Sequence, residues 1–156
     1  MTRATFTAWR IVKAKFAASA FDGEGARRFA GRWNSKGTPM VYTAGSQALA
    51  VLELLVHLED SDLLKHYRLI PVTFDNAMVK VLDLKTLPTN WNRRPTPTSV
   101  RALGDAWIAS GDSAVLQVPS VVVPGENNYL LNPRHPDLAK MNIGKPQTYR
   151  LDPRFR

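Results

Sequence analysis

The sequence predicts an α+β domain in which helices flank a mixed or antiparallel β-sheet. Strand-like and helix-like segments are interspersed along the chain, but they do not alternate strictly, as a doubly wound sheet would require. The length of 156 residues suits a single domain, 1–156, with one core. Apolar residues form 44% of the chain, which favours a folded protein over a disordered one.

The first third of the chain predicts two strands, a long loop and a helix. "FTAWRIV" (6–12) has β-rich residues at alternating positions, and "MVYTA" (40–44) is a second short strand. Residues 21–39 lie between them, are rich in Gly and Arg and have no period. They therefore predict a long loop, a kind of segment that often carries function. Ser46 is placed as the N-cap of a helix from about Gln47 to Leu58.

The middle of the chain predicts a strand pair followed by a second helix. "YRLIPVTF" (67–74) and "MVKVLDL" (78–84) are expected to pair through the turn "DNA". The Pro-rich segment 87–98 connects them to an amphipathic helix, "SVRALGDAWIASG" (99–111). One side of this helix is apolar and Gly111 ends it. The apolar positions are Val100, Leu103, Trp107 and Ile108.

The last part of the chain predicts short strands and one short helix. Residues 113–133 are expected to form two short strands broken by prolines, then a turn and a third strand. "HPDLAKMN" (135–142) is a short helix with Pro136 in its first turn. "QTYRL" (147–151) is the last predicted strand.

The chain carries 21 basic and 13 acidic side chains, a net charge of +8. This surplus is compatible with nucleic acid, a phosphorylated small molecule or an acidic protein as partner. The basic residues come in short groups at 26–28 and 92–94 and in a tail with Arg150, Arg154 and Arg156, and such scattered charge is usually a solvated surface. No helix-turn-helix, zinc-finger or RNA-binding signature accompanies them.

Several absences narrow the class of protein. The chain has no cysteine, which excludes disulfides and thiolate metal sites. His57, His66 and His135 lack the spacing of metal ligands, so no metal is expected. No apolar run approaches the roughly 18 residues that span a bilayer, and the N-terminus lacks the apolar core of a signal peptide. We therefore expect a cytoplasmic protein without a membrane partner.

Glu53 is a carboxylate inside the apolar segment "ALAVLELLVHLED" (48–60). A helix that is apolar all round is usually buried on most sides, and an ionised carboxylate is costly to bury without partners. Two explanations fit the spacing equally well. Glu53 forms a structural ion pair with an arginine or with His57, or it faces a cleft, where catalytic acids are found.

Four other residues are candidates for a site. Arg32 follows Gly31, which permits close backbone approach, and its planar fork suits a phosphate or a carboxylate; a surface arginine is the alternative. Arg10 on the first strand is either buried and paired or on the exposed face. Ser120 lies in the apolar "VPSVVVP", where its hydroxyl needs a backbone partner or a ligand. Tyr42 is a core residue or a stacking platform.

Four segments occur in order: "WR" (9–10), "GEGARRFAGRWN" (23–34), "VYTAGSQALAVLELL" (41–55) and "VPSVVVPGENNYLLNPRHP" (118–136). Together they resemble the RES domain family, which is named for an arginine, a glutamate and a serine. The resemblance covers nearly the whole chain. Arg32, Glu53 and Ser120 match the three letters of the family name.

The resemblance implies a toxin of a bacterial toxin–antitoxin pair that acts on NAD⁺, with a fold similar to that of ADP-ribosyltransferases. Some members degrade NAD⁺ by hydrolysis or phosphorolysis, and others transfer ADP-ribose to a protein. The usual antitoxin carries a Xre-type helix-turn-helix domain and covers the active site, so contact with nucleic acid is indirect. A non-enzymatic binding module is a more distant alternative.

The resemblance also implies roles for the candidate residues. Arg32, Glu53 and Ser120 are the expected catalytic set. Arg10 and Arg32 are expected to hold the pyrophosphate or ribose side of NAD⁺, and Tyr42 to stack on the nicotinamide ring. Ser120 is expected to contact the nicotinamide ribose or to orient Glu53. His57 has no expected role beyond packing.

Overall fold

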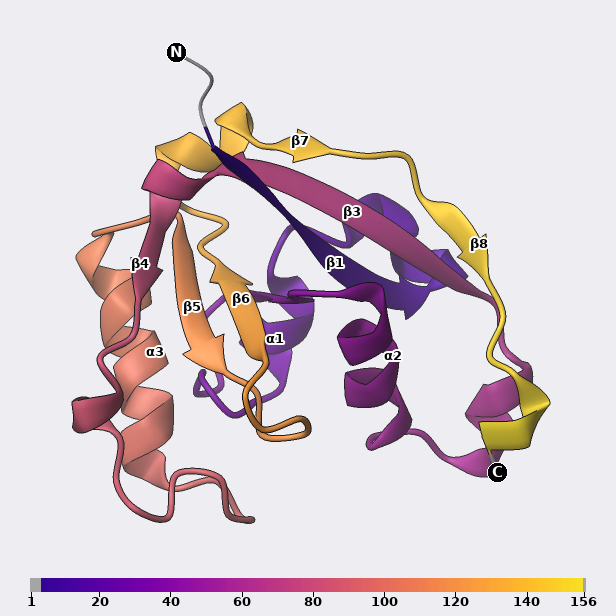
Figure 1. Ribbon diagram of the computed structural model, residues 1–156, viewed down its shortest axis with the longest axis horizontal. Helices are drawn as coiled ribbons and strands as arrows, with labels where there is room; N and C mark the ends of the chain where they lie inside the picture. The colour runs from indigo at the N-terminus through magenta and orange to yellow at the C-terminus, as the bar shows by residue number, and fades with distance from the viewer. Residues whose placement is uncertain (1–3, 156) are drawn as a thin grey trace.

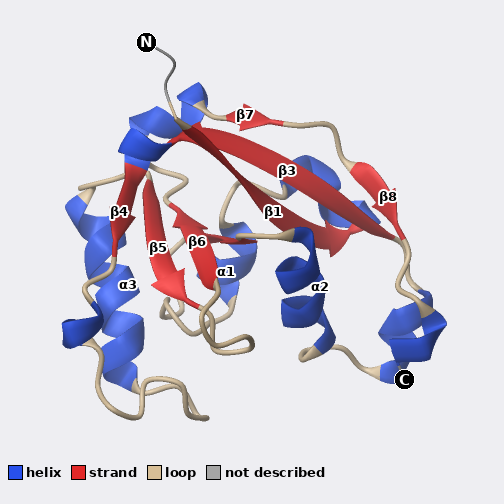
Figure 2. Ribbon diagram, in the orientation of Figure 1, coloured by secondary structure: helices blue, strands red, loops and turns tan. Residues whose placement is uncertain are grey.

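The computed structural model describes residues 4–155, in which eight strands form one mixed sheet (Figures 1 and 2). The strands are β1 (Thr5–Lys13), β2 (Val41–Ala44), β3 (Tyr67–Asp75), β4 (Val79–Val81), β5 (Val115–Pro119), β6 (Asn127–Leu131), β7 (Asn142–Ile143) and β8 (Gln147–Tyr149). The order is β4-β5-β6-β2-β1-β3-β7, and β8 also pairs with β3. Strands β4 and β5 are parallel, and the remaining pairs are antiparallel. The predicted α+β fold with a mixed sheet is confirmed.

Strands β1 and β3 form an arch across the molecule in Figure 1. They pair from Thr5 opposite Asp75 to Lys13 opposite Tyr67. By contrast, β1 pairs with β2 at one described position, Trp9 opposite Ala44. The sheet therefore opens between β1 and β2 immediately after Trp9, and the residues of both strands beyond this point are available to line a cavity.

Helix α2 (Gln47–Leu55) begins as the sequence predicts. The Ser46 hydroxyl accepts a hydrogen bond from the Leu49 amide at 3.1 Å, which caps the helix. Its buried residues Leu49 and Ala50 pack against Trp9 and Ile11 of β1. The helix ends at Leu55, before the predicted Leu58.

The apolar surface of α2 is less buried than its composition suggests. Leu52 is 39% exposed and Val56, just after the helix, is 50% exposed. The expectation that most sides of this helix are buried is wrong, because its buried residues are only Leu49, Ala50 and Val51. Glu53 therefore sits on a partly open helix and not inside a sealed core.

Helix α3 (Thr98–Ser110) lies beside β4 and β5 in Figure 1 and buries Val100, Trp107 and Ile108, with Gly111 as its C-cap. Its apolar face is the predicted one, with Leu103 partly buried. A Cβ at Gly104 would lie 1.7 Å from the Trp33 carbonyl oxygen, so glycine lets α3 approach the loop 29–40 closely. That loop follows a short helix, α1 (Glu24–Arg28), which the sequence did not predict.

Two predicted strand arrangements are wrong. Residues 67–74 and 78–84 do not pair, because β4 joins the far edge of the sheet beside β5. The Asp75 side chain accepts the Ala77 amide at 2.8 Å and starts a 3₁₀ turn, Asn76–Met78, that redirects the chain. Residues 121–124 form no strand either, because the Val122 and Val123 amides bond to the Ser120 hydroxyl instead of a neighbouring strand.

The C-terminal part follows the prediction in outline. The short helix at 135–142 is a 3₁₀ turn, Pro136–Lys140, and the last strand is β8, shorter than the predicted 147–151. The other 3₁₀ turns are Ala14–Ser19, Asp60–Leu64, Leu84–Thr86 and Pro153–Phe155. No helix within residues 4–155 is both long enough and apolar enough to cross a membrane.

Candidate active site

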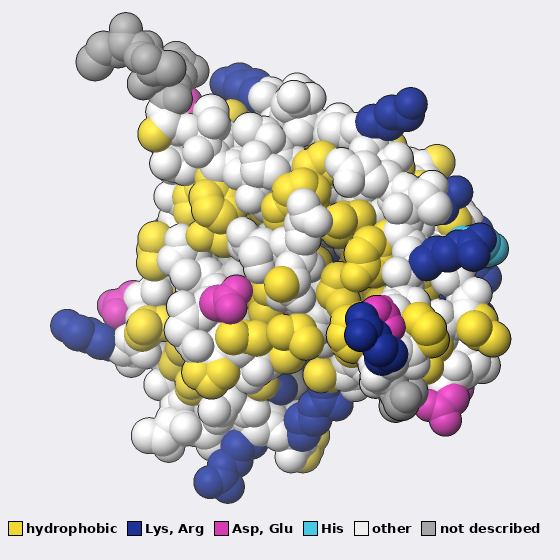
Figure 3. All heavy atoms as spheres, turned by 45° about the vertical axis from the view of Figure 1, so that its right-hand side comes forward, with side chains coloured by type: hydrophobic (Ala, Val, Ile, Leu, Met, Phe, Trp, Pro, Cys, Tyr) yellow, Lys and Arg dark blue, Asp and Glu magenta, His cyan; other side chains and the backbone are white. Residues whose placement is uncertain are grey.

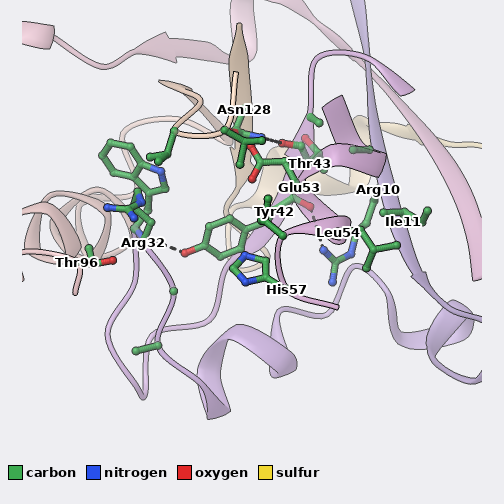
Figure 4. A pocket seen from close by; sticks show the side chains of 18 of the residues that line it. Arg10, Ile11, Arg32, Tyr42, Thr43, Glu53, Leu54, His57, Thr96 and Asn128 are labelled. Carbon is green, nitrogen blue, oxygen red and sulfur yellow. Dashed lines mark hydrogen bonds between the residues drawn. The ribbon is translucent and has the colours of Figure 1, made fainter. Parts of the chain in front are cut away.

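A cavity of about 530 Å³ opens where β1 and β2 separate. Its walls come from β1, the loop 30–33, β2, α2 and the residues just after it, the Pro-rich loop, α3, the start of the β5–β6 connection and β6. Figure 4 shows Tyr42 near its centre, with Arg32 and Thr96 on one side of the ring and Glu53 and Arg10 on the other. The charged or histidine side chains in its wall are Arg10, Arg32, Glu53, His57, Arg94 and Arg101.

Glu53 is oriented by Ser120. The Ser120 hydroxyl accepts the Val122 and Val123 amides, each at 3.1 Å, and lies 2.9 Å from Glu53 Oε1. Because a serine hydroxyl has one proton and two acceptor sites, the two amides leave the proton to be donated to Glu53. The carboxylate oxygen therefore acts as an acceptor, which suits its ionised form.

Glu53 makes no ion pair with any residue of the described chain, and His57, one turn further on, lines the cavity without bonding to it. The cleft explanation for this carboxylate thus fits the structure better than the ion-pair explanation. Ser120 is 3% exposed and lies outside the cavity wall. It contacts the cavity through its hydrogen bond to Glu53.

Arg32 is held by the Pro-rich loop. Its Nη1 donates to the Trp91 carbonyl at 2.8 Å and the Arg93 carbonyl at 3.2 Å. Within residues 4–155 its Nε and Nη2 make no hydrogen bond, so they remain available in the cavity wall. Burial, followed by the charges of Arg94 and Arg101, lowers the pKa of Arg32 from its ordinary value.

The loop that carries Arg32 is fixed by Tyr42 and Asn34. The Tyr42 hydroxyl donates to Asn34 Oδ1 at 2.5 Å and accepts the Trp33 amide at 3.1 Å. A Cβ at Gly31 would lie 2.6 Å from the Tyr42 hydroxyl oxygen, so the close approach expected of this glycine occurs. Burial raises the pKa of Tyr42, which keeps the hydroxyl protonated. With its hydroxyl engaged in the loop, Tyr42 presents its ring to the cavity.

Arg10 bridges the opening between β1 and β2. Its Nε donates to the Ala20 carbonyl at 2.5 Å and its Nη1 to the Tyr42 carbonyl at 2.9 Å. Burial lowers the pKa of Arg10 to about 10, and the charge of Asp22 partly offsets this effect. The guanidinium therefore stays charged at neutral pH. Its Nε and Nη1 bond to backbone carbonyls, and the residue lines the cavity.

The sequence prediction missed five polar residues of the cavity wall: Thr43, Arg94, Thr96, Arg101 and Asn128. Arg101 on α3 donates from Nε to the Gly31 carbonyl at 2.9 Å, and Asn128 on β6 donates to the Thr43 carbonyl at 3.3 Å. Arg94 belongs to the basic group 92–94, which was expected to be solvated surface. Asn128 lies within the quoted motif 118–136, so it was within reach of motif reasoning, whereas nothing local marks Arg101.

The cavity thus combines one carboxylate with four guanidinium groups. The described residues contain no group of three or more His, Cys, Asp or Glu side chains that suits a metal ion. On the face shown in Figure 3, Lys and Arg side chains are spread out and apolar ones run between them, as the scattered charge predicts. The fold and the cavity define a class: a curled α+β domain whose cavity holds one fixed carboxylate beside four guanidinium groups.

Comparison with known proteins identifies the family. The RES domain model matches residues 7–152, and the chain belongs to the RES domain family. It is 39% identical over 149 residues to the Toxin Res of Yersinia enterocolitica serotype O:8 / biotype 1B, covering 95% of this chain and 98% of that protein. It is 36% identical over 156 residues to the Prs ADP-ribosylating toxin of Sphingobium sp. (strain YBL2), covering 97% of each.

A solved structure shares the fold. The crystal structure of the M. tuberculosis MbcT-MbcA toxin–antitoxin complex contains a chain that aligns with a TM-score of 0.78 at 20% identity. The alignment covers 95% of this chain and 86% of that one. At this identity the likeness is one of fold, and it agrees with the mixed sheet described above.

Proposed function

We propose that this protein is the toxin of a toxin–antitoxin pair and consumes NAD⁺ by cleaving its nicotinamide–ribose bond. One observation carries the proposal: in a cavity rich in arginine, the Glu53 carboxylate is held by a hydroxyl and makes no ion pair with residues 4–155. NAD⁺ has the matching chemistry, an anionic diphosphate and a ribose carbon that becomes cationic as the bond breaks. The toxin names of the relatives support the same function.

The reaction follows from these groups. The C1′–N bond breaks and both electrons go to the ring nitrogen, so nicotinamide leaves as a neutral molecule without acid catalysis. The ribosyl cation that develops is stabilised by the negative charge of Glu53. Water then attacks C1′ and loses its proton to solvent, giving ADP-ribose; inorganic phosphate in its place gives a phosphate ester. A second carboxylate acid, as in most glycosidases, is not required.

The other candidate residues bind and orient the substrate. Arg32, with Nε and Nη2 available, and Arg10 hold the diphosphate or the ribose. The Tyr42 ring stacks on nicotinamide between them. Ser120 keeps Glu53 in place and leaves its charge intact. Arg32, Glu53 and Ser120 form the catalytic set in this proposal, with Ser120 acting through Glu53.

The second candidate is a protein mono-ADP-ribosyltransferase, which the name of the 36% identical relative favours. It uses the same bond cleavage but delivers the ribose to a side chain. NAD⁺ labelled in the adenylate part separates the two functions. Label on a protein band supports transfer, and free ADP-ribose or its phosphate ester supports degradation.

The proposed partner is an antitoxin with a Xre-type helix-turn-helix domain, in a hetero-oligomer with the toxin. The antitoxin then makes the DNA contact, and the net charge of +8 on the toxin attracts the anionic substrate. NAD⁺ is a cytoplasmic dinucleotide, so the proposed reaction takes place there. A non-enzymatic binding module would instead predict that Arg32→Ala and Glu53→Ala leave the effect on cell growth unchanged.

The direct test is nicotinamide release from NAD⁺ by the purified chain, free of any co-purified antitoxin. We expect Glu53→Gln to lower the rate by about 10²–10³-fold, the size typical of losing an electrostatic stabiliser. Glu126→Gln makes the same change at an exposed residue outside the cavity and should keep the rate. Intact NAD⁺ under hydrolytic, phosphate-containing and protein-acceptor conditions would contradict the proposal. A large fall in melting temperature for Glu53→Gln would instead assign Glu53 a structural role.

A further inference from the structure

Three arginines of the cavity wall come from three separate segments of the chain. Arg32 lies in the loop after α1, Arg94 in the Pro-rich loop and Arg101 in the first turns of α3. The proposed reaction uses Arg32 alone of the three. Arg94 and Arg101 have no role in it, although both side chains face the same cavity.

Main-chain contacts bring these segments together. The Arg93 carbonyl, which precedes Arg94, accepts a hydrogen bond from Arg32 Nη1 at 3.2 Å. The Gly31 carbonyl, which precedes Arg32, accepts one from Arg101 Nε at 2.9 Å. Gly104 allows the backbone of α3 to lie against the carbonyl of Trp33, the residue that follows Arg32. The three segments therefore meet in the cavity wall, which Arg32, Arg94 and Arg101 all line.

Their positive charges are not neutralised by direct ion pairs with the described residues. Within residues 4–155 none of the three forms an ion pair, and the partners of Arg32 and Arg101 are neutral carbonyls. Asp105, one turn after Arg101 on α3, uses its Oδ1 to accept the Ser35 amide at 2.9 Å. Burial first, and then the nearby charges of Arg94 and Arg101, lower the pKa of Arg32. Like charges held together without partners favour a polyanionic ligand.

We propose that Arg94 and Arg101 join Arg32 in a phosphate-binding subsite that takes the diphosphate of the substrate dinucleotide. This assignment rests on the proposed function. In Figure 4 Arg32 and Thr96 lie across the Tyr42 ring from Glu53, so the anionic and cationic parts of NAD⁺ would lie on opposite sides of that ring. Planar guanidinium forks bind phosphate oxygens in pairs, which suits a diphosphate. Inorganic phosphate as acceptor offers the same chemistry, and the test must separate the two sources.

The test compares Arg94→Gln and Arg101→Gln with Arg150→Gln, an equal change of charge at an exposed residue outside the cavity. Calorimetry gives the Kd of ADP-ribose, and turnover is measured on NAD⁺ and on nicotinamide riboside, which lacks the diphosphate. We expect each cavity variant to weaken ADP-ribose binding roughly tenfold or more. Cleavage of nicotinamide riboside should stay within about twofold of wild type, and Arg150→Gln should match wild type throughout.

The outcomes are distinct. Unchanged ADP-ribose affinity in both cavity variants overturns the assignment, even if NAD⁺ is cleaved. A second result also overturns the assignment. If ADP-ribose affinity is unchanged but the rate no longer depends on phosphate concentration, the arginines bind the phosphate acceptor instead of the diphosphate. Weakened ADP-ribose binding in a protein that releases no nicotinamide supports the subsite and contradicts the proposed reaction. Arg94 makes no hydrogen bond in the described part of the chain, so Arg94→Gln tests the subsite even if Arg101→Gln fails to fold.

Discussion

Replacing Ser120 by alanine removes a hydroxyl that three neighbours use at once. It accepts the amides of Val122 and Val123 and donates to Glu53 Oε1. The substitution deletes the oxygen without changing the backbone. Two consequences follow, one for the rate through Glu53 and one for stability through the turn at 120–123.

Both magnitudes follow from these bonds. A hydrogen bond to a charged group contributes about 1.5–3 kcal/mol. If the transition state loses that much stabilisation because Glu53 is no longer oriented, kcat falls roughly 10- to 100-fold, since about 1.4 kcal/mol is a factor of ten. The two amides lie in a partly exposed turn where water replaces part of the lost bonding, so the stability cost is about 1–2 kcal/mol. For a chain of this size that lowers Tm by roughly 2–8 °C.

The assay is steady-state nicotinamide release together with a thermal melt. Because Ser120 lies outside the cavity wall, KM for NAD⁺ should stay within about twofold while kcat falls. Ser46→Ala is the matched control, since it removes the cap of the helix that carries Glu53 but leaves the Ser120–Glu53 bond. The control should lose about 1 kcal/mol of stability and keep its kcat.

Two results would refute this reasoning. Ser120→Ala with the expected fall in Tm but an unchanged kcat would mean that Glu53 needs no orientation by the hydroxyl. Equal losses of kcat in Ser120→Ala and Ser46→Ala would assign the effect to general loosening of α2.

Three further predictions use other contacts. Gly31→Ala should cost about 1–3 kcal/mol, because its Cβ would overlap the Tyr42 hydroxyl, whereas Gly25→Ala meets nothing within 4 Å and should be near neutral by thermal melt. Tyr42→Phe should lower stability by about 1–3 kcal/mol by leaving loop groups unpaired, yet keep the ring, so KM should rise less than in Tyr42→Ala. The Asp62 carboxyl has its pKa lowered to about 2, first by the hydrogen bond from Lys65. Its stabilisation is therefore present above its ordinary value near 3.8 and lost as pH falls towards 2, and Asp62→Asn should flatten the dependence of Tm on pH in that window.

Local patterns in the sequence predict much of the fold. The alternation of 67–74, the Ser46 cap and the apolar face of α3 are local signals, because each depends only on residues within or next to one element. The pairing of β4 with β5 instead of β3 depends on a 3₁₀ turn and on strands far along the chain. Such non-local pairing leaves no mark in the segment 78–84 itself.

The site divides in the same way. Gly31, Arg32, Ser120 and the apolar context of Glu53 are visible in the sequence, and the family resemblance assigns roles to Arg32, Glu53 and Ser120. The bond between Glu53 and Ser120 joins residues 67 positions apart, so no spacing rule predicts it. Arg101 reaches the cavity because Gly104 lets α3 approach Trp33, a contact between a helix and a distant loop.

The charged groups of the cavity are held by neutral partners, so they remain available to bind a ligand. Arg10, Arg32 and Arg101 are fixed by main-chain carbonyls, and Glu53 is fixed by a hydroxyl. These partners restrain position without neutralising charge. Carboxylates elsewhere in the described chain, such as Asp62 with Lys13 and Lys65, are paired with cations at the surface. A cavity whose charges were paired in that way would have to break ion pairs to bind a ligand. Neutral restraints avoid that cost, so a substrate with both an anionic and a developing cationic part meets preorganised partners for each.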